Sequence, residues 1–130
     1  MTNVGGVAVK VPYTYIEGLQ IQMVSANDNT DKNILIQTAS AGPVYISSNI
    51  CYGSSSTVAW ADGIEPWFSG VGDVYIYNNI LYNFKPSGGG GAIEVWSANS
   101  TVYIYNNTLY NSVAGVRSDE STAIYAKNNL

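Results

Sequence analysis

The chain has no histidine and a single cysteine among its 130 residues. Without histidine it has neither a Ser-His or Cys-His catalytic pair nor a histidine-ligated metal site. Because Cys51 is alone, no disulfide can form within the chain, and a small buried apolar role is the simplest interpretation of this residue.

Charge is also scarce. Charged residues make up 11% of the chain, the net charge is −4, and Lys and Arg together number five. So few basic side chains argue against nucleic acid as a partner, because no basic stripe exists to neutralise phosphates. No apolar run approaches the roughly 20 residues that span a bilayer. A polar surface built from Asn, Ser, Thr and Tyr is typical of an extracellular protein or of one on a cell or virion surface.

One short phrase recurs down the chain. It reads VYISSNICY from Val44, VYIYNNILYN from Val74, VYIYNNTLYN from Val102 and IYAKNNL from Ile124, with a degenerate copy, YTYIEGLQI, from Tyr13. The starts are 31, 30, 28 and 22 residues apart. A fixed phrase at such a period is the signature of a solenoid, in which each repeat stacks on the previous one.

Alternating apolar and polar residues in each phrase predict a strand, and the Asn-Asn pair predicts a turn into a second strand. A further strand is expected between phrases, at 34–36, 64–67, 93–96 and 116–119. Three short strands per repeat favour a right-handed parallel β-helix over the hexapeptide left-handed form. The sequence therefore predicts an all-β solenoid of four to five coils, with residues 1–130 forming one module.

The phrase NN-x-[IL]-Y-N, which covers most of the chain from Tyr13 onward, resembles the parallel β-helix repeat of the pectate lyase-like superfamily. The resemblance implies the fold. It does not select an activity, because the superfamily includes polysaccharide lyases, glycoside hydrolases, phage tailspikes and adhesins. It also implies an asparagine ladder at one turn, formed by Asn49, Asn79, Asn107 and Asn129.

Outward-facing tyrosines are expected to form a flat patch with polar tips, centred on Tyr75, Tyr77, Tyr103 and Tyr105. Such a patch has three interpretations: packing beneath a loop or flanking domain, self-association, or stacking on a glycan. The tyrosines are thus candidates for an interface.

A second face combines acids with tryptophans. Glu65, Glu94 and Arg117 are expected in one vertical column. The carbohydrate-binding candidates beside them are Trp67, Trp96, Asp62 and Asp119. Carboxylates about 5 Å apart suit a retaining glycoside hydrolase, but any two residues in one column have this spacing. The alternatives are ion pairing of Arg117 with Glu94, carbohydrate binding, and catalysis by Glu65, Glu94 and Arg117.

The segment 27–33 is expected to be a loop between coils, with Asp28 and Asp31 as weak candidates for binding Ca²⁺. Polysaccharide lyases of the superfamily place basic residues and Ca²⁺-binding acids on one outer sheet. Here only Arg117 is expected near acids, and this departure argues against lyase activity.

Both ends of a β-helix expose strand edges, so the chain is expected to be a fragment of a longer solenoid or a subunit that stacks end to end on copies of itself. The start of the chain lacks the regions of a signal peptide. The sequence favours a non-enzymatic structural or adhesive module, and end-to-end association of such modules would form a fibre. The alternative is a fragment of a carbohydrate-active enzyme or tailspike whose working face carries Trp67 and Trp96.

Overall fold

The structure of the protein is a computed structural model that describes residues 6–23, 31–38, 41–53, 60–68, 72–85, 87–97, 100–118 and 122–130. Within these residues every regular element is a β-strand. The strands are β1 (Val7–Val9), β2 (Thr14–Glu17), β3 (Gln20–Gln22), β4 (Asp31–Ile36), β5 (Val44–Ser47), β6 (Ile50–Tyr52), β7 (Ala61–Phe68), β8 (Val74–Tyr77), β9 (Ile80–Tyr82), β10 (Ile93–Ser97), β11 (Thr101–Tyr105), β12 (Thr108–Tyr110), β13 (Val116–Ser118) and β14 (Ala123–Lys127).

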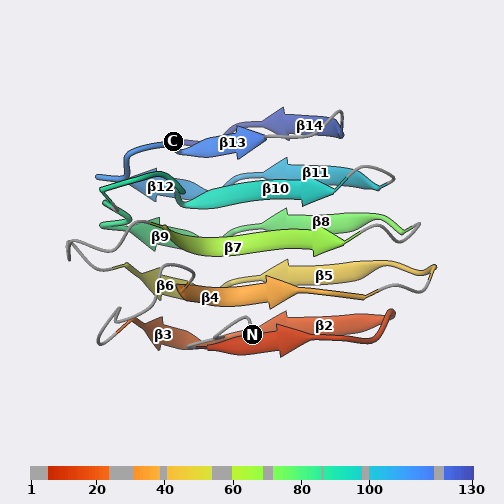
Figure 1. Ribbon diagram of the computed structural model, residues 1–130. Coiled ribbons are helices and arrows are strands. Elements are labelled where there is room, and N and C mark those ends of the chain that lie inside the picture. Colours follow the sequence, from red (N-terminus) through yellow and green to blue (C-terminus); the bar gives the residue numbers. More distant parts are fainter. Residues whose placement is uncertain are drawn as a thin grey trace.

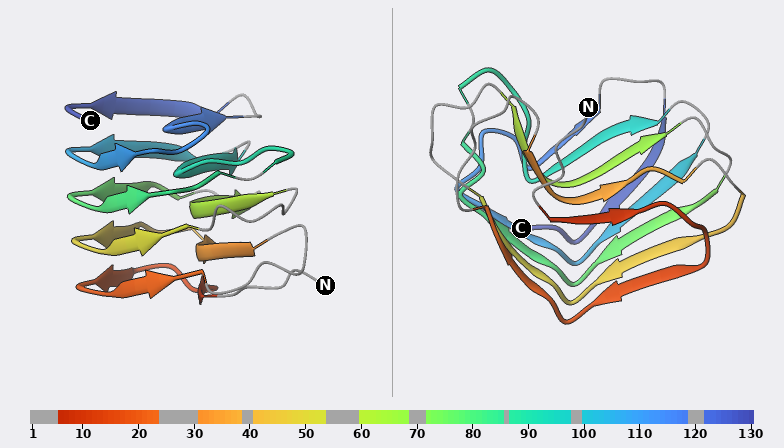
Figure 2. Two further views of the ribbon diagram at one scale, coloured as in Figure 1. Left: turned by 90° about the vertical axis from the view of Figure 1, so that its left-hand side faces the viewer. Right: turned by 60° about the horizontal axis from the view of Figure 1, so that its bottom comes forward.

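The strands form three parallel sheets. The β7 sheet has the order β1-β4-β7-β10-β13, the β8 sheet β14-β11-β8-β5-β2, and the β9 sheet β12-β9-β6-β3. Consecutive strands belong to different sheets, and the chain returns to each sheet one layer further on (Figures 1 and 2). This stacked, all-strand arrangement is compatible with a parallel β-helix and confirms the solenoid organisation predicted from the repeats.

Strand register aligns like residues from successive repeats. Val44 pairs with Val74, which pairs with Val102, and Tyr45, Tyr75 and Tyr103 align in the same way. The predicted start of the degenerate first copy was wrong by one residue, because Thr14 rather than Tyr13 pairs with Val44. The first and second copies are therefore separated by the same number of residues as the second and third.

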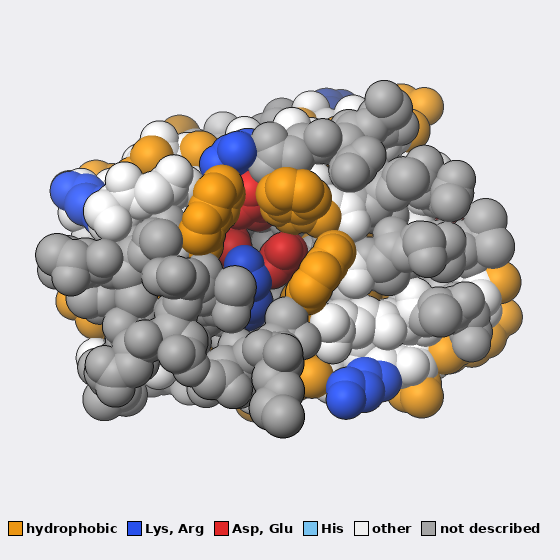
Figure 3. All heavy atoms as spheres, in the orientation of Figure 1, with side chains coloured by type: hydrophobic (Ala, Val, Ile, Leu, Met, Phe, Trp, Pro, Cys, Tyr) orange, Lys and Arg blue, Asp and Glu red, His pale blue; other side chains and the backbone are white. Residues whose placement is uncertain are grey.

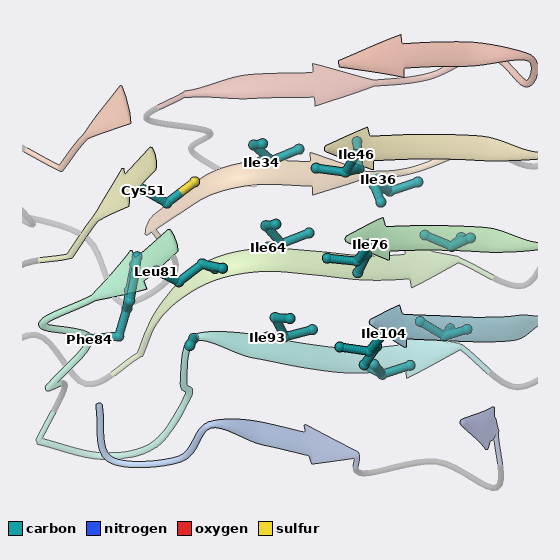
Figure 4. Packing of buried hydrophobic residues seen from close by; sticks show 14 of the residues in the cluster. Ile34, Ile36, Ile46, Cys51, Ile64, Ile76, Leu81, Phe84, Ile93 and Ile104 are labelled. Atoms are coloured by element: carbon teal, nitrogen blue, oxygen red, sulfur yellow. The ribbon is translucent and has the colours of Figure 1, made fainter. Parts of the chain in front are cut away.

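The inward side chains form the hydrophobic core between the sheets. Ile34, Ile64 and Ile93 stack along the β7 sheet and are fully buried (Figure 4). The facing column comes from the β8 sheet and comprises Ile46, Ile76 and Ile104, while the β9 sheet and its following turn supply Cys51, Leu81 and Phe84. Burial raises the pKa of the Cys51 thiol to about 12, which keeps it protonated and unreactive at neutral pH.

Residues with positive φ angles turn the chain between the β8 and β9 sheets. They occupy equivalent positions in successive repeats: Gly18, Ser48, Asn78, Asn106 and Asn128, with φ between 54° and 71°. Asparagine adopts this left-handed conformation more readily than most residues, and glycine does so without strain. The first Asn of each Asn-Asn pair is therefore explained by backbone geometry.

The second Asn of each pair points inward and forms a hydrogen-bonded column. The side-chain amide of Asn49 donates to Oδ1 of Asn79, and that of Asn79 donates to Oδ1 of Asn107, each at 3.0 Å. The amide of Asn107 continues the series to Asn129. Each also donates to a backbone carbonyl, such as that of Ile46, so the column satisfies polar groups of the turn that burial would otherwise leave unpaired.

We expect Asn107→Leu to lower the free energy of unfolding by about 1–3 kcal/mol, because it leaves the buried carbonyl of Ile76 and the amides of Asn79 without their partner. Urea denaturation measures this change. Gln22→Leu, an amide-to-leucine change at an exposed strand position, is the control and should shift the value by less than about 0.5 kcal/mol. Equal midpoints for the two variants would show that the column does not stabilise the fold.

Candidate functional site

The outer face of the β7 sheet gathers charged residues from four strands. Because Ile64 and Ile93 point inward, the residues after them, Glu65 and Glu94, lie on the outer face. The register places Arg117 beside Glu94. In β4 and β7 it also places Lys32 beside Asp62. We call these five residues the charged cluster.

Two sets of ion pairs connect the charged cluster. Nζ of Lys32 contacts Oδ2 of Asp62 and lies 2.7 Å from Oε2 of Glu65. Nε of Arg117 lies 3.6 Å from Oε1 of Glu94. The sequence expectation that only Arg117 would lie near acids was therefore wrong, because Lys32 lies between two carboxylates.

The cluster is deeply buried for an outer face. Asp62 and Glu94 have no exposed surface, Glu65 is 4% exposed and Lys32 is 6% exposed. Burying ionised groups costs several kcal/mol each, and pairing them often does no more than offset that cost. An apolar column would stabilise this sheet at least as well, so the cluster is a candidate functional site.

The glycine run after β9 packs against this cluster. Gly91 donates its backbone N–H to Oδ1 of Asp62 at 2.9 Å. Gly90 has a φ of 103°, and a Cβ there would lie 2.6 Å from the same oxygen. Gly89 forms a parallel bridge with Trp60. The backbone of this run therefore approaches the buried carboxylate of Asp62 and donates a hydrogen bond to it.

The indole rings of Trp60, Trp67 and Trp96 border the charged cluster, and we call them the indole rim. Trp67 and Trp96 are cross-strand neighbours in the β7 sheet, and Trp67 is 43% exposed. The guanidinium carbon of Arg117 lies 5.3 Å from the centre of the Trp60 ring, a cation–π contact. Figure 3 shows acidic and basic side chains at the bottom of a hollow in this face, with hydrophobic side chains around its edge.

The pKa values of Lys32 and Glu65 are both raised. The shift favours the charged form of Lys32 and the neutral form of Glu65. For Lys32, burial would lower the pKa, but the attraction of Asp62 and Glu65 outweighs it and the pKa is raised. For Glu65, burial raises the pKa to about 7, even though Lys32 opposes the shift. Both results follow if Asp62 is the main counter-ion of Lys32, which leaves Glu65 incompletely compensated.

The structure brings together six of the sequence candidates on one face: Asp62, Glu65, Trp67, Glu94, Trp96 and Arg117. The three carboxylates are buried at this face. Asp28 and Asp119 lie outside the described residues. Asp31 begins β4, so the segment predicted as a loop at 27–33 is a strand from residue 31 onward. The side chain of Asp31 lies outside the described part of the structure.

The sequence prediction did not assign Lys32 to this site, although its spacing from Asp62 could have indicated it. It precedes Asp62 by 30 residues, the period of the neighbouring repeats. Local composition obscured it, because a run of Asn, Asp and Thr before it favours a loop.

The tyrosine candidates lie on the β8 sheet, away from the charged cluster. The rings of Tyr75 and Tyr103 are stacked with centroids 4.7 Å apart, and Tyr15, Tyr45 and Tyr125 extend the stack. Tyr105 is tilted against Tyr103 at 6.0 Å, and Tyr77 aligns with Tyr105 in the strand register.

Comparisons with protein-family models, curated proteins and solved structures each found no match. In the described part of the chain, no group of His, Cys, Asp or Glu side chains is arranged to hold a metal ion. The same residues contain no helix that is long and apolar enough to cross a membrane.

The raised pKa of Glu65 predicts how stability depends on pH. The folded-state pKa of about 7 exceeds the ordinary value of 4.5, so the folded protein binds more protons between these values. The free energy of unfolding should therefore fall as pH rises from about 4.5 to 7, with a contribution from Glu65 on the order of 3 kcal/mol. Lys32 stays protonated throughout this window because its pKa is raised.

Urea denaturation of the wild type and of Glu65→Gln at pH 5 and pH 8 measures this contribution. The variant should lose most of the decline, whereas Glu17→Gln, which removes an exposed carboxylate from the β8 sheet, should retain it. The same decline in all three proteins would show that Glu65 titrates normally.

Proposed function

We propose that this chain is a non-enzymatic adhesive module of an extracellular or surface protein, built as a right-handed parallel β-helix of four to five coils. Its binding face is the outer face of the β7 sheet, where Trp67 and Trp96 hold a polysaccharide. The family resemblance of the repeat phrase supports the handedness, and the low charge content of the surface supports the location.

The observation that carries this proposal is the indole rim above buried, charged side chains. A flat aromatic ring stacks on the apolar face of a sugar. Trp67 is exposed at 43% in a protein whose other large side chains on this sheet are mostly buried. A long, straight column of equivalent positions also suits an extended polymer, because successive layers present their side chains at a regular pitch.

A binding role fits the burial of the acids better than a catalytic one. Glu94 has no exposed surface and Glu65 only 4%, so a glycosidic bond would have limited access to either carboxylate. Both carboxylates are also within 4 Å of a basic side chain. Trp67 of the rim, by contrast, is exposed, and Trp60 and Trp96 are half-buried.

Trp67→Ala should weaken polysaccharide binding about tenfold, because loss of one stacked ring removes roughly 1–1.5 kcal/mol. Tryptophan fluorescence of the wild type should shift on titration with a bound polysaccharide, and calorimetry can compare the variants. Tyr110→Ala removes a 68% exposed aromatic ring from the β9 sheet and should leave affinity unchanged. Equal losses in both variants, or wild-type fluorescence that responds to no polysaccharide, would contradict the proposed face.

One observation favours a second function, glycoside hydrolysis. The register that aligns Ile64 with Ile93 places Glu65 beside Glu94. A carboxyl group with a pKa of about 7 can donate a proton at neutral pH while a second carboxylate acts as nucleophile or base.

This second function predicts release of reducing ends from a polysaccharide at a rate that falls above pH 7, as Glu65 loses its proton. Glu65→Gln should abolish that release, while Glu17→Gln should not. Absence of any release by the wild type across a panel of neutral, amino and acidic polysaccharides would leave binding as the function of this face.

A further inference from the structure

Three members of the charged cluster are placed so that they can react with one another. We propose that Lys32 and Asp62 become joined by an amide bond between Nζ and Cγ, formed inside the folded chain with Glu65 as the group that transfers the protons. This inference goes beyond polysaccharide binding and does not depend on it. The bond would link two successive layers of the β7 sheet covalently, in a chain that cannot form an internal disulfide.

The strand register holds the reacting groups in contact. Lys32 in β4 and Asp62 in β7 are paired residues of neighbouring parallel strands. Nζ of Lys32 contacts Oδ2 of Asp62, and the same nitrogen lies 2.7 Å from Oε2 of Glu65. An amine held against a carboxyl group in one folded chain reacts as if it were at very high concentration, because the entropy of bringing the two groups together has already been lost. The guanidinium of Arg117 has no such chemistry, since it stays protonated.

The glycine run after β9 prepares Asp62 to be attacked. Its second carboxylate oxygen, Oδ1, accepts the backbone N–H of Gly91 at 2.9 Å. When Nζ adds to Cγ, negative charge develops on this oxygen, and a fixed N–H donor stabilises that charge as in an oxyanion hole. Gly90 permits the close approach, because its φ is 103° and a Cβ there would lie 2.6 Å from Oδ1.

The ion pair must become neutral before the amine can attack. The pKa of Lys32 is raised, so its proton is not readily lost to water. Instead the proton passes to Oδ2 of Asp62, which contacts the nitrogen. Burial favours the resulting neutral pair relative to the same exchange in water, because ionised groups are poorly stabilised there. A small population of this pair is sufficient, since formation of the amide removes it from the equilibrium.

Glu65 completes the reaction by moving one proton. Its carboxylate accepts a proton from the attacking nitrogen, 2.7 Å away, and returns it to Oδ2 of Asp62. Oδ2 then leaves as water while the C=O bond re-forms at Oδ1. A pKa of about 7 suits a group that accepts and then returns a proton near neutral pH. One ammonium and one carboxylate thus become one amide and one water molecule, with no oxidation or reduction and with Glu65 unchanged.

The burial of the cluster favours the amide over the ions. Lys32, Asp62 and Glu65 are all buried, so the reaction removes two ionised groups from a poorly hydrated position, and water has little access to Cγ for the reverse reaction. The cation that opposed the shift of Glu65 is also lost. The pKa of Glu65 therefore stays raised, and the dependence of stability on pH keeps the direction given above.

Mass spectrometry of the denatured protein tests this proposal. The folded chain, incubated at neutral pH until its mass is constant, should weigh one water molecule less than its sequence requires. In an unlinked chain, trypsin cuts after Lys32 and separates residues 11–32 from the segment that contains Asp62. The amide should block this cut, and fragment-ion sequencing should place the bond at Nζ. A full mass with normal cleavage after Lys32 would overturn the proposal.

Loss of water alone does not identify the bond. Asp62 precedes Gly63, and an Asp-Gly sequence can also lose water by closing a succinimide ring. A succinimide leaves the amine of Lys32 free, so trypsin would still cut after this residue. A reduced mass with normal cleavage after Lys32 would therefore overturn the proposal as well.

Matched variants test the role of each group. Lys32→Arg and Asp62→Ala should have the full mass, whereas Lys127→Arg, at an exposed position of β14, should lose water as the wild type does. Glu65→Gln should leave most molecules unlinked, and Glu17→Gln, at an exposed position of β2, should not. A blocked cut after Lys32 in Asp62→Ala would place the bond elsewhere and overturn the proposal. Complete linkage in Glu65→Gln would overturn the role of Glu65. The wild-type result decides the proposal even where a variant fails to fold.

Discussion

Parallel, in-register pairing between successive repeats is the constraint on which the rest of this structure depends. Each strand hydrogen-bonds to the equivalent strand one repeat away, so every side chain lies directly above or below its counterpart. The same residue type therefore recurs at equivalent positions of successive repeats. Isoleucine stacks on isoleucine in the core, asparagine bonds to asparagine at the turn, and tyrosine stacks on tyrosine outside.

The same constraint is unfavourable for charged residues, because stacking like on like would place acids directly over acids. The β7 sheet departs from strict repetition where this problem arises. Lys32 occupies the layer next to Asp62, and Arg117 the layer next to Glu94, so opposite charges flank the acids in the column direction. Glu65 and Glu94 nevertheless remain neighbours, and this is the place where the repeat tolerates an unfavourable arrangement. The irregular positions, rather than the regular ones, are therefore those that call for a functional explanation.

Features at regular positions of the repeat could be predicted from the sequence, and features at irregular positions could not. The three strands per repeat, the inward isoleucines and the aligned tryptophans were predictable because each depends on a local pattern that recurs at a fixed period. Lys32 was not assigned to the site because its role depends on a partner in the next repeat while its own neighbours favour a loop. The burial of Glu65 and Asp62 was missed for another reason. For Asp62 it depends on the approach of Gly90 and Gly91, which belong to a segment with no repeat pattern.

A solenoid can maintain such a costly site because its stability is distributed along its length. Each layer is stabilised by backbone hydrogen bonds and core contacts with its neighbours, so a local penalty on one outer face is offset by interactions on the other two sheets of the same layer. The asparagine column lies at the corner between the β8 and β9 sheets, remote in the coil from the β7 face, and so the turn geometry is held independently of the charges. Separation of the stabilising columns from the charged face leaves the identity of residues on that face free to be set by a ligand rather than by the fold.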